Sequence, residues 1–105
     1  MEEKEKWDRI CNYWWRGAED DYEAGEILLS SGKYRQALFF LHLAIEKALK
    51  ALFVRRQKDY APLTHNLVFL FGKVFPEKEK KILDFLIEIS GFSIEMRYPD
   101  EEKET

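Results

Sequence analysis

Apolar residues recur along the chain at steps of three and four, which is the spacing of one helix face. The first such stretch covers residues 7–29, and a Ser-Ser-Gly segment at residues 30–32 ends it. Glycine suits the left-handed conformation that follows a helix, and serine commonly caps the start of the next one. The pattern therefore predicts a first helix over 7–29 and a second helix that begins near Lys33.

The next stretch, residues 33–56, contains no glycine or proline and is rich in strong helix formers. It predicts a long central helix. A loop with a proline follows, and Thr64 is the expected N-cap of a short third helix over 65–74, which carries a dense apolar run. Two further helices, one long and one short, are thus predicted after the first.

A fourth helix is predicted to begin at Pro76, because proline is well tolerated in the first turn of a helix. Pro99 closes this helix, and the charged tail 100–105 is expected to fray. No segment alternates apolar and polar residues with the period of a strand. The predicted fold is a single all-α domain over 1–105, an antiparallel up-and-down four-helix bundle.

The helical wheel of 33–56 has two different faces. Apolar residues fill about half of the circumference, and this half is expected to face the core. The opposite side holds a band of about 80° in which ionisable groups stand between aromatic rings, some of them at i, i+4 spacing. We call this band the polar stripe; it consists of Arg35, Phe39, His42, Glu46, Lys50 and Phe53. A solvated face, a subunit interface and a ligand-contacting surface all fit this pattern.

Two further polar residues interrupt apolar surroundings. Asp21 projects into the apolar side of the first helix, where a carboxylate without a partner would cost several kcal/mol. A helix N-terminus or one of four cations is expected to reach it, namely Arg35, Lys47, Lys50 or Arg97. Asp21 fits a structural ion pair or a functional carboxylate. His65, in the expected first turn of the third helix, fits a structural group or a ligand contact.

The overall charge excludes a protein that holds nucleic acid by bulk basicity. Lysine and arginine number 17 against 20 acidic residues, so the net charge is −3. Any contact with nucleic acid must therefore come from a local patch. Hydrophobic residues make up 46% of the chain and charged residues 35%, which is the composition of a globular domain with a real core.

Motifs for metal, cofactor or covalent chemistry are missing from the sequence. Cys11 is the only cysteine, and it forms no metal-ligand spacing with His42 and His65. No GxGxxG, GxxxxGK or GxSxG sequence occurs, and no pair of carboxylates has the spacing of an acid and a base. We expect no metal and no cofactor, and nothing in the sequence demands an enzyme.

Targeting signals are also missing. The N-terminal residues alternate acids and bases without the apolar core of a secretory signal, and no apolar run approaches the roughly 20 residues of a membrane span. The expected location is the cytoplasm, without membrane contact.

Several short motifs together cover nearly the whole chain. The most specific pair is the sequence HLAIEKALKA at 42–51 followed, after a loop, by THNL at 64–67. The remaining motifs are Ala18-x-x-Asp21, the residues Gly32, Tyr34, Ala37 and Phe40 that precede the first of that pair, and Arg97-Tyr98-Pro99. In this combination the chain resembles the HEPN domain (higher eukaryotes and prokaryotes nucleotide-binding).

The resemblance implies a small antiparallel helical bundle that usually dimerises. Such domains are often encoded with a minimal nucleotidyltransferase, and they are similar to the helical domain that completes the substrate site in some aminoglycoside nucleotidyltransferases. The polar positions that match the family are Asp21, His42, Glu46, Lys50, His65 and Arg97. With Arg35 from the polar stripe, they form the predicted site for a nucleotide or a protein partner. The expected function is a non-catalytic, homodimeric nucleotide-binding module or nucleotidyltransferase partner.

A ribonuclease is the alternative function that the resemblance implies. One branch of the family consists of metal-independent ribonucleases, many of them toxins of toxin–antitoxin systems, with an Arg-x4-6-His motif late in the chain. Here no histidine follows Arg97, and only Arg35 and His42 satisfy the spacing, in the second helix instead. RNA is expected as a partner only under this alternative.

Overall fold

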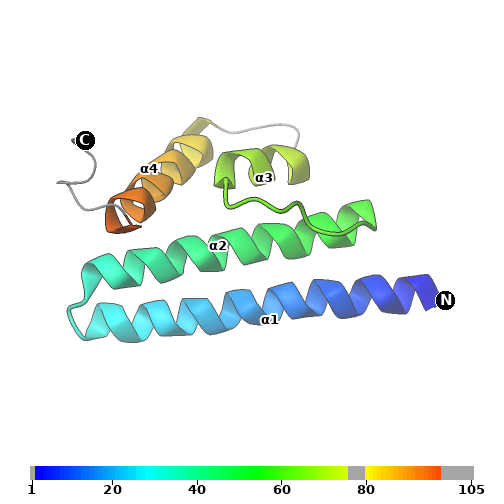
Figure 1. The fold of residues 1–105 in the computed structure, drawn as a ribbon, viewed down its shortest axis with the longest axis horizontal. Helices are drawn as coiled ribbons and strands as arrows, with labels where there is room; N and C mark the ends of the chain where they lie inside the picture. The colour runs from blue at the N-terminus through cyan, green and yellow to red at the C-terminus, as the bar shows by residue number, and fades with distance from the viewer. Residues whose placement is uncertain (1, 76–79, 98–105) are drawn as a thin grey trace.

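The computed structural model describes residues 2–75 and 80–97, with side chains up to residue 91 in the second range. Within these ranges the chain forms helices and no strand, so the predicted all-α fold is confirmed. The predicted helix start at Pro76, the helix end at Pro99 and the fraying tail 100–105 lie outside the described residues. The four helices of Figure 1 are α1 (Glu2–Ser30), α2 (Tyr34–Gln57), α3 (Leu67–Val74) and α4 (Lys80–Arg97).

Helices α1 and α2 form a long antiparallel hairpin (Figure 1). Gly32, in the turn between them, has a φ of 79°, the left-handed conformation expected after a helix. The expected serine cap is wrong: the Ser31 hydroxyl donates to the Ile27 carbonyl oxygen within α1. Lys33 is the N-cap of α2 and makes no side-chain cap bond.

Small residues let the two long helices approach closely. A Cβ atom at Gly25 of α1 would stand 3.4 Å from the carbonyl oxygen of Ala37 in α2. Ala18 of α1 and three alanines of α2 are buried as well, namely Ala37, Ala44 and Ala51. The main-chain contact leaves little space for side chains between the helices, so the hairpin depends on these positions staying small.

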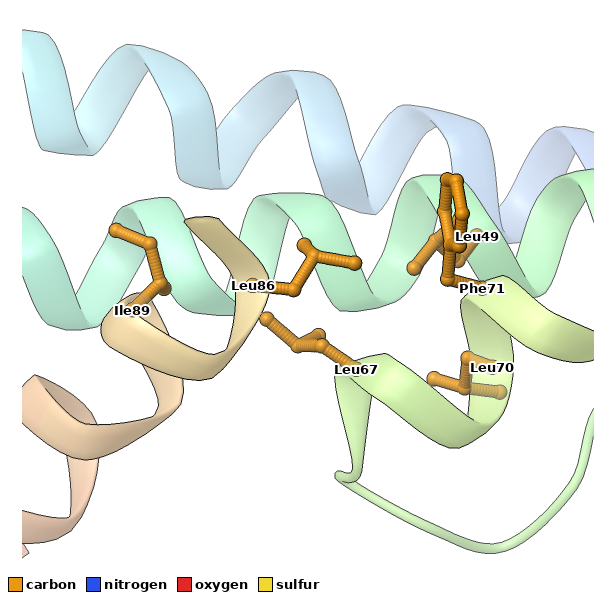
Figure 2. Packing of buried hydrophobic residues seen from close by; sticks show 6 residues of the cluster. All are labelled: Leu49, Leu67, Leu70, Phe71, Leu86 and Ile89. Atoms are coloured by element: carbon orange, nitrogen blue, oxygen red, sulfur yellow. The ribbon is translucent and has the colours of Figure 1, made fainter. Parts of the chain in front are cut away.

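The core lies between α2, α3 and α4, and α2 is the central helix because it packs against each of the other three. Figure 2 shows how side chains of α3 and α4 point toward α2. Burial of each large apolar side chain contributes roughly 1.5–3 kcal/mol relative to exposure. The buried cluster consists of Leu49, Leu67, Leu70, Phe71, Leu86 and Ile89.

Helix α3 begins two residues later than predicted, and its N-cap is Asn66 rather than Thr64. The Asn66 side-chain oxygen accepts a hydrogen bond of 3.0 Å from the Phe69 amide, whereas the Thr64 hydroxyl accepts one from the Asn66 amide. Both residue types can cap a helix, and here threonine shapes the loop before the cap. His65 therefore lies in this loop and not in a helical turn.

The C-terminal end of α2 is tied to the end of α3. The Arg56 guanidinium donates a hydrogen bond of 2.8 Å to the Val74 carbonyl oxygen, which would otherwise lack an intrahelical partner. It also lies over the Phe75 ring, 5.3 Å from its centroid. This tie fixes α3 against the hairpin.

No helix among the described residues combines the length and apolarity needed to cross a lipid bilayer.

Candidate functional site

The centre of the polar stripe is buried inside the protomer. His42 and Glu46 are 4% exposed and Lys50 is 5% exposed, while Arg35 near the start of α2 is exposed. The expectation that the stripe forms an outer surface is therefore wrong for these three side chains. A helical wheel assumes one covered face, but α2 has neighbours on opposite sides, so its polar positions are also covered by the same chain.

Glu46 is the centre of a buried cluster of charged and polar groups. One carboxylate oxygen lies 3.2 Å from the Lys50 ammonium, and the other lies 3.7 Å from Nε2 of His42. Nδ1 of His65 lies 3.0 Å from both oxygens of the carboxylate. The Glu46 carboxylate can accept from that nitrogen in the tautomer that has its proton on Nδ1. The carboxylate has several donors around it, as a buried charge requires.

Lys50 connects this cluster to α1. Its ammonium lies 5.0 Å from the centroid of the Trp14 ring, so it has a carboxylate on one side and an aromatic face on the other. The ammonium is thus held between two partners in a place that water hardly reaches. The cluster can hold α1, α2 and the loop before α3 in register.

The structure brings four of the seven predicted site residues together. His42, Glu46 and Lys50 come from α2, and His65 reaches Glu46 from the loop before α3 with an imidazole that is 68% exposed. Arg35 lies about two turns before His42, the first member of this cluster on α2. Arg97 is the last residue of α4, and its side chain lies outside the described residues.

Asp21 forms a separate ion pair. Its carboxylate lies 2.7 Å from the Lys47 ammonium and its side chain is 14% exposed. Lys47 is one of the four cations expected to reach it, so the predicted ion pair is confirmed. A Cβ atom at Gly17 would come within 3.0 Å of Cδ of Lys47. The glycine therefore leaves room for the lysine stem as it crosses α1 toward Asp21.

A hollow of about 580 Å³ opens beside this ion pair, on the surface of the hairpin. It brings three cations next to two aromatic rings. We call it the basic hollow; its lining residues are Arg9, Asn12, Tyr13, Trp14, Arg16, Gly17, Asp20 and Lys47. None of the seven predicted site residues lines it, but two of them contact its wall: Asp21 holds Lys47, and Lys50 lies against Trp14.

Sequence reasoning missed the basic hollow, although a signal was present. Arg9 and Arg16 are seven residues apart and Tyr13 stands between them, so all three share one face of the first helix. This face does not carry the apolar stripe, so the sequence alone indicates an ordinary solvated surface. Only the structure shows that Trp14 and Lys47 lie beside it. The hollow can hold an anionic ligand with a planar ring. Guanidinium groups bind phosphate and carboxylate oxygens in pairs, and the aromatic side chains can stack on the ring.

Among the residues that the structure describes, no three His, Cys, Asp or Glu side chains are grouped so that they could hold a metal ion.

Comparison with models of protein families matches residues 11–105 to the HEPN domain. The matched range contains the whole of α2, α3 and α4, both predicted motifs in the middle of the chain, and all but the first part of α1. The chain matches no curated protein and no solved structure.

Proposed function

The chain belongs to the HEPN domain family, and from this premise we propose that it is a non-catalytic nucleotide-binding module whose ligand site is the basic hollow. The observation that carries the proposal is the meeting of Arg9, Arg16 and Lys47 with the Tyr13 and Trp14 rings in one hollow. Its volume of about 580 Å³ is of the size that small ligands occupy.

Each part of a nucleotide has a chemical counterpart in the hollow. Arg9 and Arg16 supply guanidinium groups for phosphate oxygens, and the Tyr13 ring offers a face for base stacking. Stacking on an aromatic ring contributes roughly 1–3 kcal/mol per base and tolerates different bases. Asp20 supplies a carboxylate that can accept from sugar hydroxyl groups.

Two of the predicted site residues serve this proposal as positioning residues. Asp21 holds the Lys47 ammonium at the edge of the hollow, and Lys50 supports the Trp14 ring from inside. Glu46 acts one step further away through Lys50, with His42 and His65 around it. Arg35 and Arg97 have no assigned part in the hollow, and they stay candidates for contact with a partner.

The proposal is tested by titrating the protein with ATP and, separately, with adenosine in a calorimeter. ATP is expected to bind about tenfold or more tightly than adenosine, because the phosphates meet the two arginines. Arg16→Glu is expected to reduce ATP affinity by a similar factor, since it replaces an attractive charge by a repulsive one. It is expected to change adenosine affinity much less.

Arg35→Glu is the matched comparison, because it makes the same charge change on an exposed arginine of the polar stripe. ATP affinity is expected to stay within about twofold of the wild type, since Arg35 does not line the hollow. A larger loss in Arg35→Glu than in Arg16→Glu would move the nucleotide site to the polar stripe. Absence of ATP binding by the wild type would contradict the proposal itself.

A second candidate function is that of a partner module, either as a homodimer or as the partner of a nucleotidyltransferase subunit. Both need an apolar face that another chain can cover. Such a face is supported by the exposed side chains of Trp15, Tyr22 and Leu29 on α1, which stand beside α2 away from the basic hollow. Nucleotide binding and partner binding can coexist, because they use different sides of the hairpin.

A toxin-type ribonuclease that uses Arg35 and His42 is less well supported. A catalytic imidazole must touch the reacting atoms, and His42 is 4% exposed. RNA cleavage that disappears in both Arg35→Ala and His42→Ala, with both variants folded by circular dichroism, would favour the ribonuclease over the binding module.

A further inference from the structure

An apolar groove runs between α1 and α2 on the side away from the basic hollow. It consists of two hollows of about 440 and 670 Å³ that share Tyr22, Glu26 and Leu41. Tyr13 of the basic hollow and Tyr22 of the groove are nine residues apart, which is about two and a half turns at roughly 100° per residue, so they lie on opposite faces of α1. The hairpin therefore has two distinct sides.

The α1 wall of the groove is a ridge of exposed large side chains at heptad spacing. Trp15 is 47% exposed, Tyr22 is 54% exposed and Leu29 is 55% exposed. A seven-residue repeat of apolar residues is the pattern by which one helix packs along another. The opposite wall belongs to α2. It begins with the exposed Tyr34 ring and continues with small and branched apolar residues: Ala37, Leu38, Leu41, Ala44, Ile45 and Ala48.

All charged residues that line the groove are acidic, namely Glu19, Glu23 and Glu26 of α1. Glu19 and Glu26 stand four residues after Trp15 and Tyr22, which is the flanking position of a heptad seam. Charges at flanking positions form ion pairs across helix pairs and set the choice of partner. A partner helix with basic flanks would complement this acidic lining.

A second copy of the chain does not meet this requirement at the ridge. A two-fold axis perpendicular to α1 would run the two ridges antiparallel and bring the Glu19 and Glu26 column of each copy against the same column of the other. Like charges in that position are destabilising. Charge complementarity thus favours a different chain.

We propose that the groove binds an amphipathic helix of a different protein, with an apolar stripe flanked by lysine or arginine residues. The distance from Trp15 to Leu29 along α1 is about 21 Å at a rise of 1.5 Å per residue, so the bound segment has about four helical turns. The inference rests on the partner-module part of the proposed function, and it is independent of nucleotide binding.

The test uses two designed helical peptides of about 20 residues, both with leucine at heptad seam positions. One peptide has lysine at the flanking positions and the other has glutamate. With fluorescently labelled peptides, anisotropy is expected to show that the whole protein binds the lysine peptide about tenfold or more tightly than the glutamate peptide. Equal affinity for the two peptides, or no binding of either, would overturn the inference.

Charge-swap variants separate the groove from the overall negative charge of the protein. Glu19→Lys combined with Glu26→Lys is expected to reverse the peptide preference. Asp84→Lys combined with Glu88→Lys makes the same charge change at exposed positions of α4, and it is expected to keep the lysine peptide preferred. Reversal in both double variants would overturn the inference, because the peptide would then be responding to net charge.

Aromatic variants separate the inference from the proposed nucleotide site. Trp15→Ala combined with Tyr22→Ala is expected to lower lysine-peptide affinity about tenfold or more and to leave ATP affinity unchanged. Tyr13→Ala is expected to do the opposite. Failure of ATP binding alone would contradict the proposed function, whereas failure of peptide binding alone would contradict the groove.

Sedimentation equilibrium tests the competing occupant. The Trp15→Ala/Tyr22→Ala variant is expected to have the same mass in solution as the wild type. A wild-type dimer that this double variant dissociates would show that a second copy covers the groove, and the inference would be overturned.

Discussion

Glu46 is the residue on which the interior depends most, because its carboxylate has Lys50, His65 and His42 around it. Its burial is costly by itself and is offset only while its partners are in place. The Lys50 ammonium depends on Glu46 in the same way, because without that carboxylate its remaining partner among these contacts would be the Trp14 ring. The cluster therefore behaves as one unit, in which the loss of one charge penalises the other.

Glu46→Leu is expected to lower the free energy of unfolding by about 3–5 kcal/mol, because it leaves a buried cation without a counter-charge. Adding Lys50→Met is expected to restore at least half of this loss, since the second variant removes the orphaned charge. Urea denaturation followed by circular dichroism measures both. Additive losses in the double variant would mean that the two side chains do not depend on one another.

Site predictions could succeed where they rested on the physical requirement of a single residue. The prediction that Asp21 has a cationic partner, or a helix N-terminus, followed from one physical requirement: a carboxylate among apolar residues needs a compensating group. Which of the four candidate cations reaches it did not follow from the sequence. The meeting of Glu46 with His65 involves residues 19 positions apart, in elements whose relative placement no local pattern gives. The basic hollow was missed for the same reason, because Lys47 joins Arg9 and Arg16 only after α2 is placed against α1.

At the scale of elements, the periodicity of apolar residues predicted which segments form helices, but it did not predict which helices pack against one another. The apolar half of α2 was expected to face a single core, but it is covered by α1 along one edge and by α3 and α4 along the other. Near the middle of that half, Ala48 lines the open groove, and Leu41 lines the groove while it also packs against the core cluster. A wheel gives the direction of each side chain on one helix and carries no information on where other helices dock.

The start of α3 provides a direct test of helix capping. Asn66→Ala is expected to lower the free energy of unfolding by about 1 kcal/mol, because the Phe69 amide loses its acceptor. Asn66→Ser keeps a capping oxygen and is expected to retain most of the stability. Thr64→Ala, at the cap position that the sequence suggested, is expected to cost less than Asn66→Ala. A larger loss in Thr64→Ala would identify threonine as the effective cap.

At the scale of the whole molecule, α2 is the element that all other helices share, so its middle should open last. Local opening requires the loss of contacts, and the buried turn around Leu49, Ala51 and Val54 contacts neighbours on opposite sides. The first turn of α1 has exposed side chains and few such contacts. Stability is therefore expected to fall from the centre of α2 toward the start of α1.

Amide hydrogen exchange measured by mass spectrometry tests this order. Peptides that cover residues 44–54 are expected to exchange slowest, by a factor of about 100 or more relative to those that cover residues 2–6. The reason is that the central amides exchange only through near-global unfolding. Uniform protection along α1 and α2 would indicate that the hairpin opens as a single unit without an inner gradient.

The two sides of the hairpin also differ in electric potential. Arg9, Arg16 and Lys47, with Asp20 among them, line one side, and Glu19, Glu23 and Glu26 line the other, so the two sides present mainly opposite charges. Such a field turns an approaching ion before contact and speeds association, and the effect weakens as ionic strength rises. An anion and a cationic helix would arrive from opposite directions, so neither would obstruct the approach of the other.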